Sequence, residues 1–153
     1  MPIIIISASK SPQSKSVVGS DLTHVSSKTI SNSNENFVGD ILSENLIGMN
    51  YFQSGGYGAV SGIQLRGQPK RYSTVYINGI KLSAPSTPSN DYYFSNLINN
   101  SLNSVEIVKG SQSSLYGSGA IAGTINLYPK KGEKEGHYQD GFISEGSYGT
   151  RNI

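Results

Sequence analysis

The sequence predicts an α+β fold built from short elements and two large loops, and three observations lead to this prediction. Only 35% of the 153 residues are hydrophobic and 18 are glycine, a composition that favours turns and exposed loops over long helices. Apolar residues recur at helical spacing in one segment, residues 35–46. Short apolar runs lie elsewhere, and two of them are joined by Asn78-Gly79, a dipeptide typical of a tight hairpin turn.

The other expected elements are short and spread over the whole chain. Residues 1–16 are expected to form an extended, mobile arm, because β-branched Ile3–Ile6 are followed by Ser, Lys and Pro. Strands are expected at residues 17–25, 62–66, 74–77, 105–108 and 122–127, and the tail at 137–150 has the pattern of a hairpin start. Loops are expected at 53–58 and 83–91, a weakly helical stretch at 92–98, one short helix within 110–119 and a linker at 129–136.

The helix over residues 35–46 has a start signal and a stop signal. Asn34 is a candidate N-cap, and Glu35 lies in the first turn, where its charge complements the helix dipole. Apolar residues from Phe37 to Ile47 keep the helical spacing, and Gly48 ends it.

Residues that carry chemistry are too few for an enzyme or a metal site. The chain has no cysteine and two histidines, His24 and His137, which are far apart in the sequence. It contains neither the G-x-S-x-G nucleophile motif nor the H-E-x-x-H metal motif. The net charge of +2 comes without a clustered basic face, which argues against nucleic-acid binding. The sequence therefore predicts neither catalysis nor a bound cofactor.

The glycine-rich run at residues 117–123 has two interpretations. One is a dinucleotide-binding loop, but the spacing here is G-x-G-x-x-x-G and a strand pattern follows at Thr124–Leu127, whereas that fingerprint is G-x-G-x-x-G and opens a helix. The other is a compact corner between two strands, in which glycine permits positive φ and close backbone approach. The residues favour the corner.

Three motifs resemble the plug domain of TonB-dependent outer-membrane receptors. The most specific is SVEIVKGSQSSLYGSGAIAGTINLYP at residues 104–129, in which a Val-Glu-Ile-Val strand and Lys109-Gly110 precede Y-G-x-x-A-x-x-G-x-I-N. The second joins I-x-L-R-G at Ile63–Gly67 to V-Y-I-N-G-I at Val75–Ile80. The helix at 35–46 is the third and is weak alone. The resemblance extends over residues 3–150.

The resemblance implies an architecture for the chain. It implies a small mixed β-sheet with short helices and long loops, plus the start of a transmembrane β-barrel. Residues 1–16 would be an N-terminal extension, 17–132 the plug, and 133–153 a linker and first barrel strand, which includes G-S-Y-G-T. One strand cannot close a barrel, so we expect the chain to be a fragment of a longer receptor.

The isoleucine-rich start has a role in this family. Ile3, Ile4, Ile5, Ile6, Ser7 and Ala8 resemble the TonB box, an extended segment that pairs as an added β-strand with the periplasmic protein TonB. An ordinary first strand is the alternative that the residues alone leave open. The downstream motifs favour the box.

The resemblance also implies contacts with a ligand and with the barrel. The loops at 53–60 and 81–94 would touch the ligand through Gln53, Tyr57, Asp91, Tyr92 and Tyr93. Arg66, Glu106 and Lys109 would make polar contacts with the barrel. Lys109 stands where the family usually has arginine, and lysine cannot form the two-pronged bond with a carboxylate, so this contact is expected to be weaker. Ser111 replaces a usual proline, and Ile47-Gly48-Met49 replaces Pro-Gly-Val.

The function implied is the gate of an outer-membrane active transporter in a Gram-negative bacterium. The plug would sit inside the barrel with its N-terminus in the periplasm, and the cargo would be a scarce ligand such as a ferric siderophore or cobalamin. The alternative is a free-standing, plug-like ligand-binding module without a barrel. The sequence that follows Ile153 discriminates between them, because a receptor continues as alternating strands with aromatic girdles.

Overall fold

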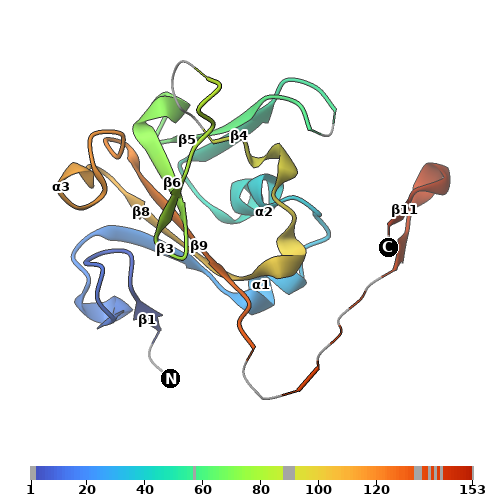
Figure 1. Cartoon of the computed structure of the whole chain (residues 1–153), viewed down its shortest axis with the longest axis horizontal. Helices are drawn as coiled ribbons and strands as arrows, with labels where there is room; N and C mark the ends of the chain where they lie inside the picture. Colours follow the sequence, from blue (N-terminus) through green and yellow to red (C-terminus); the bar gives the residue numbers. More distant parts are fainter. Residues whose placement is uncertain are drawn as a thin grey trace.

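The fold is organised by one mixed five-stranded sheet, shown in the computed structural model of Figure 1. The structure describes residues 3–56, 58–87, 92–132, 136–137, 139, 141 and 143–152. The strand order is β3-β8-β9-β6-β7, where β6 and β9 are parallel and the other pairs antiparallel. The strands are β3 (Asp21–Val25), β6 (Ser73–Ile77), β7 (Ile80–Leu82), β8 (Leu102–Lys109) and β9 (Gly123–Pro129). The α+β class and the mixed sheet are confirmed.

Side chains along β8 and β9 alternate between apolar and polar, and this gives the sheet one apolar face and one polar face. Val105 and Ile107 of β8 point with Ile125 of β9 into the main apolar core. The residues between them point the other way. They form a polar row across four strands, in which register pairs His24 with Glu106, Glu106 with Asn126, and Asn126 with Tyr76.

The apolar face is covered by two helices and a hairpin. These are α1 (Ser27–Ser31), α2 (Val38–Asn45), and β4 (Met49–Gln53) paired antiparallel with β5 (Ser61–Leu65). Figure 1 shows α2 and this hairpin on one side of the sheet, with β1 and α3 on the other. The main core therefore lies between the sheet and the α2 side, and the polar face is left for a second layer.

Two features of the helical region differ from the prediction. Helix α2 begins at Val38 with Phe37 as N-cap, so Asn34 is not the cap. The start is fixed by tertiary contacts, since Phe37 bridges to Ile98 and the Val38 N–H donates to the Leu97 carbonyl at 3.0 Å. The helix ends at Asn45, and Gly48 then turns the chain at φ +76°. The short helix α1 was not predicted.

The N-terminal arm folds back on itself instead of extending. Strand β1 (Ile4–Ile5) pairs antiparallel with β2 (Gln13–Ser14), and a 3-10 turn, η1 (Lys15–Val17), follows. The strand expected at 17–25 consequently begins only at Asp21.

The hairpin turn predicted at Asn78-Gly79 is confirmed. Asn78 and Gly79 have φ of 49° and 82° between β6 and β7, the left-handed pair that a type I′ hairpin turn requires. The short elements are α3 (Ser113–Tyr116), η2 (Lys70–Tyr72), η3 (Phe94–Asn96), η4 (Asn99–Ser101), η5 (Ser147–Gly149) and the paired tail strands β10 (Ser144–Glu145) and β11 (Arg151–Asn152). Within the described residues, no helix combines the length and apolar character needed to cross a membrane.

Candidate site at the docked N-terminal segment

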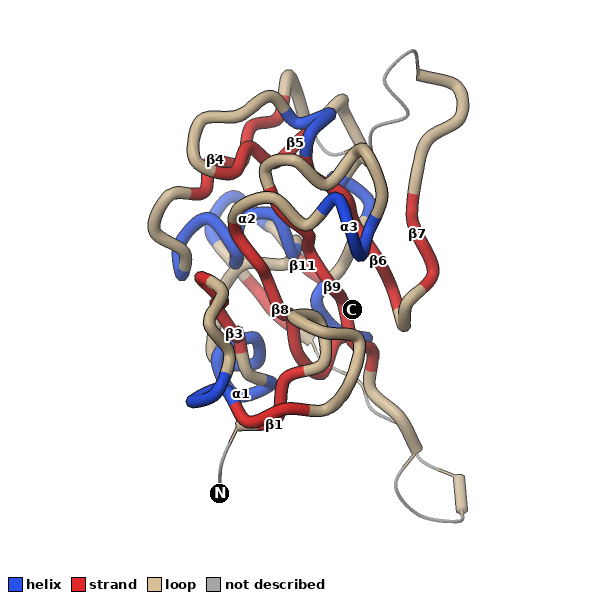
Figure 2. The backbone as a smooth tube through the Cα atoms, turned by 90° about the vertical axis from the view of Figure 1, so that its left-hand side faces the viewer, coloured by secondary structure: helices blue, strands red, loops and turns tan. Residues whose placement is uncertain are grey.

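The polar face of the sheet is covered by the N-terminal segment, which we define as residues 3–8. One edge of the segment is fixed by β2, because the Lys15 N–H donates to the Ile3 carbonyl at 2.9 Å. Figure 2 looks onto this face, with β1 and α3 toward the viewer. Sequence separation from the partners in the sheet is about a hundred residues, so nothing local dictates the docking.

A buried carboxylate holds the segment from the sheet side. Glu106 of β8 is 3% exposed, and its Oε2 accepts from the Ile6 N–H at 3.1 Å and the Ser7 N–H at 2.8 Å. The Tyr128 hydroxyl lies 3.4 Å from the same oxygen. Burying a carboxylate is costly unless it is hydrogen-bonded, and bonds to a charged acceptor are stronger than neutral ones. The backbone N–H groups of the segment therefore supply the hydrogen bonds that the buried Glu106 carboxylate requires, and the carboxylate supplies their acceptor.

A tyrosine holds the next backbone group. The Tyr116 hydroxyl, at the end of α3, donates to the Ser7 carbonyl at 2.6 Å. Tyr116 is itself fixed by Tyr76, whose hydroxyl donates to the Tyr116 carbonyl at 2.9 Å and whose ring packs edge-on at 5.0 Å. The Lys10 ammonium lies 4.9 Å from the centre of the Tyr116 ring. We call the Glu106 carboxylate and the Tyr116 hydroxyl together the clasp.

The protonation states around the clasp suit these bonds. Burial, and then the charge of Glu106, raises the pKa of Tyr116 and of Tyr128, so both phenols remain protonated donors at neutral pH. Burial lowers the pKa of His24, which faces Glu106 across the strands; Glu106 partly offsets this, and Lys15 adds to it. His24 is thus mainly neutral at pH 7, and the charge of Glu106 is balanced chiefly by backbone donors.

The side chains of the segment divide between the sheet and the surface. Ile5 is 1% exposed, whereas Ile4 and Ile6 are 52% and 40% exposed. Ser7 is buried, and its hydroxyl has no hydrogen-bond partner among the described residues. A groove of about 750 Å³ runs beside the segment and is lined by residues that include Ile4, Ile6, His24, Glu106, Tyr128 and Lys131. The segment therefore presents an apolar outer surface next to an open groove.

The loops expected to touch a ligand lie at the other end of the molecule, the top of Figure 1, whereas β1 lies at the bottom. Gln53 accepts from the Tyr51 hydroxyl at 2.8 Å and donates to the Gly55 carbonyl at 3.1 Å. Tyr92 packs edge-on against Phe94, with ring centres 5.2 Å apart, and the Lys70 ammonium lies 4.9 Å from the ring centre of Tyr93. Tyr57 and Asp91 lie outside the described residues. Ligand contact by this set stays a prediction.

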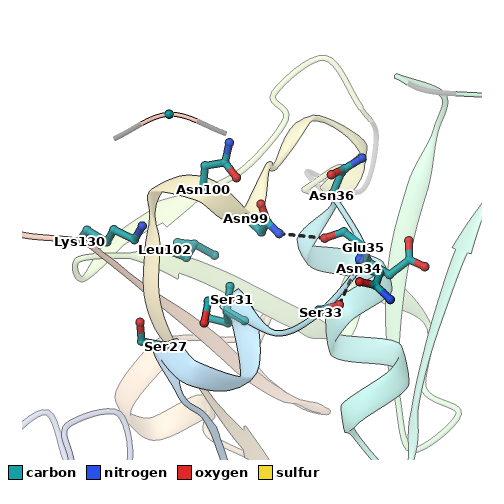
Figure 3. A pocket seen from close by; sticks show the side chains of 12 residues that line it. Ser27, Ser31, Ser33, Asn34, Glu35, Asn36, Asn99, Asn100, Leu102 and Lys130 are labelled. Atoms are coloured by element: carbon teal, nitrogen blue, oxygen red, sulfur yellow. Dashed lines mark hydrogen bonds between the residues drawn. The ribbon is translucent and has the colours of Figure 1, made fainter. Parts of the chain in front are cut away.

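A second hollow, not anticipated from the sequence, lies between α1, η4 and the segment that joins α1 to α2. It has a volume of about 460 Å³ and is lined mainly by Ser and Asn side chains (Figure 3). A hydrogen bond joins two of the segments that line it: the Asn99 side-chain amide donates to the Glu35 carbonyl at 2.8 Å. Among the described residues no three His, Cys, Asp or Glu side chains gather as metal ligands.

Comparison with known proteins places this architecture in a family. A family model described as the TonB-dependent receptor plug domain matches residues 7–124. The chain belongs to this family of plug domains. The vitamin B12 transporter BtuB of Photobacterium profundum is 34% identical over 97 residues, which are 62% of this chain and 16% of the transporter.

Solved structures agree with the assignment. The ferric yersiniabactin uptake receptor FyuA from Yersinia pestis matches 82% of this chain and 18% of the receptor, at 28% identity and a TM-score of 0.56. The ferripyoverdine receptor of the outer membrane of Pseudomonas aeruginosa matches 85% of this chain and 16% of the receptor, at 19% identity and a TM-score of 0.67. This second likeness concerns the fold alone. The plug spans less than a fifth of each relative.

The three residues expected to face a barrel are all engaged within the plug. Arg66 forms an exposed ion pair with Asp21. The Lys109 ammonium, whose side chain is 10% exposed, donates to the Ile47 carbonyl at 3.0 Å and lies 3.9 Å from Asp21. Glu106 is enclosed under the N-terminal segment. Barrel contacts of Arg66, Glu106 and Lys109 all stay predictions; within the described residues, Glu106 belongs to the clasp.

We expect Lys109→Met to lower the free energy of unfolding by about 1 kcal/mol, because the variant loses a charged donor to the Ile47 carbonyl. Urea unfolding followed by circular dichroism measures this difference. Lys28→Met is the matched control, since Lys28 lies exposed on α1. Equal unfolding midpoints for the two variants would show that the Lys109 contacts do not stabilise the plug.

Proposed function

We propose that this plug gates a TonB-dependent outer-membrane transporter that takes up a scarce ligand such as a ferric siderophore or cobalamin. Two relatives support the cargo class, since one is named as a vitamin B12 transporter and another as a ferric yersiniabactin uptake receptor. Because the chain spans less than a fifth of each, transport by the complete protein belongs to this proposal. So does the division into an extension at 1–16, a plug at 17–132, and a linker with the first barrel strand at 133–153.

The observation that carries the proposal is the separation of two exposed features by the sheet. The loops that end β4 and follow β7 are at one end, and the N-terminal segment is at the other. The segment lies outside the main apolar core and is attached to the sheet by side-chain hydrogen bonds. Elements that move in function come from regions with few contacts to the main core, because these regions open without unfolding of the whole domain. A ligand at the loops and TonB at the segment would therefore engage opposite ends of one gate.

The proposed order of events follows from this placement. Ligand binds from outside the cell at the loops, and TonB pairs with residues 3–8 in the periplasm by β-strand addition. A pull on the segment is then directed at β8 and α3, where the clasp is anchored. The plug has no role as an enzyme in this scheme. Its residues bind the ligand and hold or release the N-terminal segment.

Uptake in cells that carry the complete receptor tests the proposal. The probes are radiolabelled cyanocobalamin and a panel of radioactive iron chelates, each measured with and without TonB. We expect one probe to accumulate only when TonB is present, while its binding to the cell surface stays the same. Uptake that is independent of TonB would contradict the proposal. A reading frame without barrel strands after Ile153 would favour the free-standing module instead.

A further inference from the structure

We propose that Glu106 and Tyr116 are positioning residues that set how often the N-terminal segment is available to a partner strand. They do so by occupying backbone groups that strand pairing would use. The inference rests on the proposed function, because it takes TonB as the partner. The hold of the clasp on the segment can nevertheless be measured without TonB.

The direction of the backbone groups carries the first step. The Ile3 carbonyl faces β2, where it accepts from Lys15. Backbone groups alternate between the two edges of a strand, so the backbone of Ile4 and Ile6 faces the opposite edge. The Ile6 N–H on that edge is already bonded to Glu106 at 3.1 Å. An added strand that pairs at this edge must displace the carboxylate.

The second step concerns the hydrogen bonds of the Ser7 backbone. Its N–H is bonded to Glu106 and its carbonyl accepts from Tyr116, at 2.8 and 2.6 Å. Side chains thus fill both backbone groups of a residue that has no strand beside it. The clasp substitutes for a neighbouring strand, and clasped and strand-paired states of Ile6 and Ser7 exclude each other.

The third step is that the docked state carries a penalty. The Ser7 hydroxyl is buried and has no hydrogen-bond partner among the residues that the structure describes. A buried hydroxyl without a partner is unfavourable, and water satisfies it once the segment leaves. The hydrogen bonds to Glu106 and Tyr116 oppose the departure of the segment, whereas the buried Ser7 hydroxyl favours it. Because these two effects offset each other in part, the segment can detach without unfolding of the sheet.

Amide hydrogen exchange in the 153-residue chain tests the clasp directly. Tyr116→Phe removes only the hydroxyl bonded to Ser7, and we expect the Ile6 and Ser7 amides to exchange about tenfold faster, the effect of one hydrogen bond. Glu106→Gln should act in the same direction. Ser7→Ala removes the unsatisfied hydroxyl and should slow exchange at Ile6 about tenfold. Amides of the β8–β9 pair serve as the internal reference for global stability.

Tyr72→Phe is the matched control, because Tyr72 packs at the edge of the core and its hydroxyl accepts from the exposed Arg71 side chain at 3.3 Å, far from the N-terminal segment in sequence. We expect its Ile6 and Ser7 amides to exchange as in the parent chain. Equal exchange in Tyr116→Phe and Tyr72→Phe, or faster exchange in Ser7→Ala, would overturn the clasp. The tyrosine and serine variants keep the test intact if Glu106→Gln does not fold.

Titration with the periplasmic domain of TonB supplies the second readout. If the clasp competes with the partner, Tyr116→Phe should bind TonB up to about tenfold more tightly than Tyr72→Phe, because a larger fraction of the chain is competent to bind. A merely structural role would leave the affinity unchanged or weaken it, and either result overturns the competition. If exchange responds as expected but no variant binds TonB, the proposed partner is wrong while the hold on the segment stands.

Discussion

Replacing Ile5 by proline in the complete receptor should reduce energised uptake to the level of cells that lack TonB. Ile5 is the central residue of the N-terminal segment, is 1% exposed and pairs with Gln13. Proline lacks the backbone N–H, which at this position faces β2, and fixes φ near about −65°. It therefore breaks the pairing with β2 and moves the segment away from the extended backbone that a partner strand requires. Ligand binding should survive, because the predicted ligand loops lie at the opposite end of the plug.

The control for this prediction is Ile5→Val, which keeps the backbone donor and the β-branched shape. We expect its uptake to be close to that of the parent receptor. Surface binding of the labelled ligand is measured in parallel for both variants. Normal uptake by the proline variant would show that this segment is not the TonB box.

Gly123→Ala should lower the free energy of unfolding by about 3–5 kcal/mol, close to the whole stability of a marginal domain. Gly123 opens β9 at φ +149°, a backbone conformation that side-chain-bearing residues rarely adopt. An added Cβ would overlap the Val108 carbonyl oxygen and lie 3.0 Å from a methyl group of Leu65. Neither neighbour can yield easily, because Val108 is in the central strand β8 and Leu65 is buried in the core.

Urea unfolding followed by far-ultraviolet circular dichroism measures this loss, and Gly132→Ala is its control. Among the residues that the structure describes, none has an atom within 4 Å of the position that a Cβ on Gly132 would take, so the free energy of unfolding of Gly132→Ala should change by less than about 0.5 kcal/mol. If the two alanine variants unfold at the same urea concentration, the close contacts around Gly123 do not exclude a side chain at this position.

Local patterns in the sequence were sufficient for the sheet and its turns. The hairpin at Asn78-Gly79 follows from two residues that tolerate positive φ, and the strand after Gly123 follows from Thr124–Leu127. These features depend on neighbours within a few residues, which is the range that a sequence pattern describes. The family motifs added the resemblance to the plug domain, and the match at residues 7–124 confirms the family.

Contacts between distant residues explain what the sequence did not predict. The start of α2 moves from Asn34 to Phe37 as N-cap because Leu97 and Ile98 pair with this region from about sixty residues away. Tyr116 and Glu106 both lie in recognised motifs, yet only the folded sheet brings them to Ser7, about a hundred residues earlier. Helix α1 has only five residues, too few to repeat an apolar pattern over two helical turns, although Ser26 caps it through the Thr29 N–H.

Disulfide cross-linking to TonB shows whether the N-terminal segment is the strand that TonB pairs with, and the chain suits this experiment because it has no cysteine. Single replacements Ile4→Cys and Ile6→Cys introduce a thiol on the exposed side of the N-terminal segment, and Ile98→Cys and Ile121→Cys introduce one at comparably exposed positions elsewhere. Each is mixed with a TonB periplasmic domain that carries one cysteine in its pairing strand. We predict cross-links at positions 4 and 6 that increase with Tyr116→Phe, and none at 98 or 121. Equal cross-linking at all four positions, or none at 4 and 6, would show that TonB does not pair with residues 3–8.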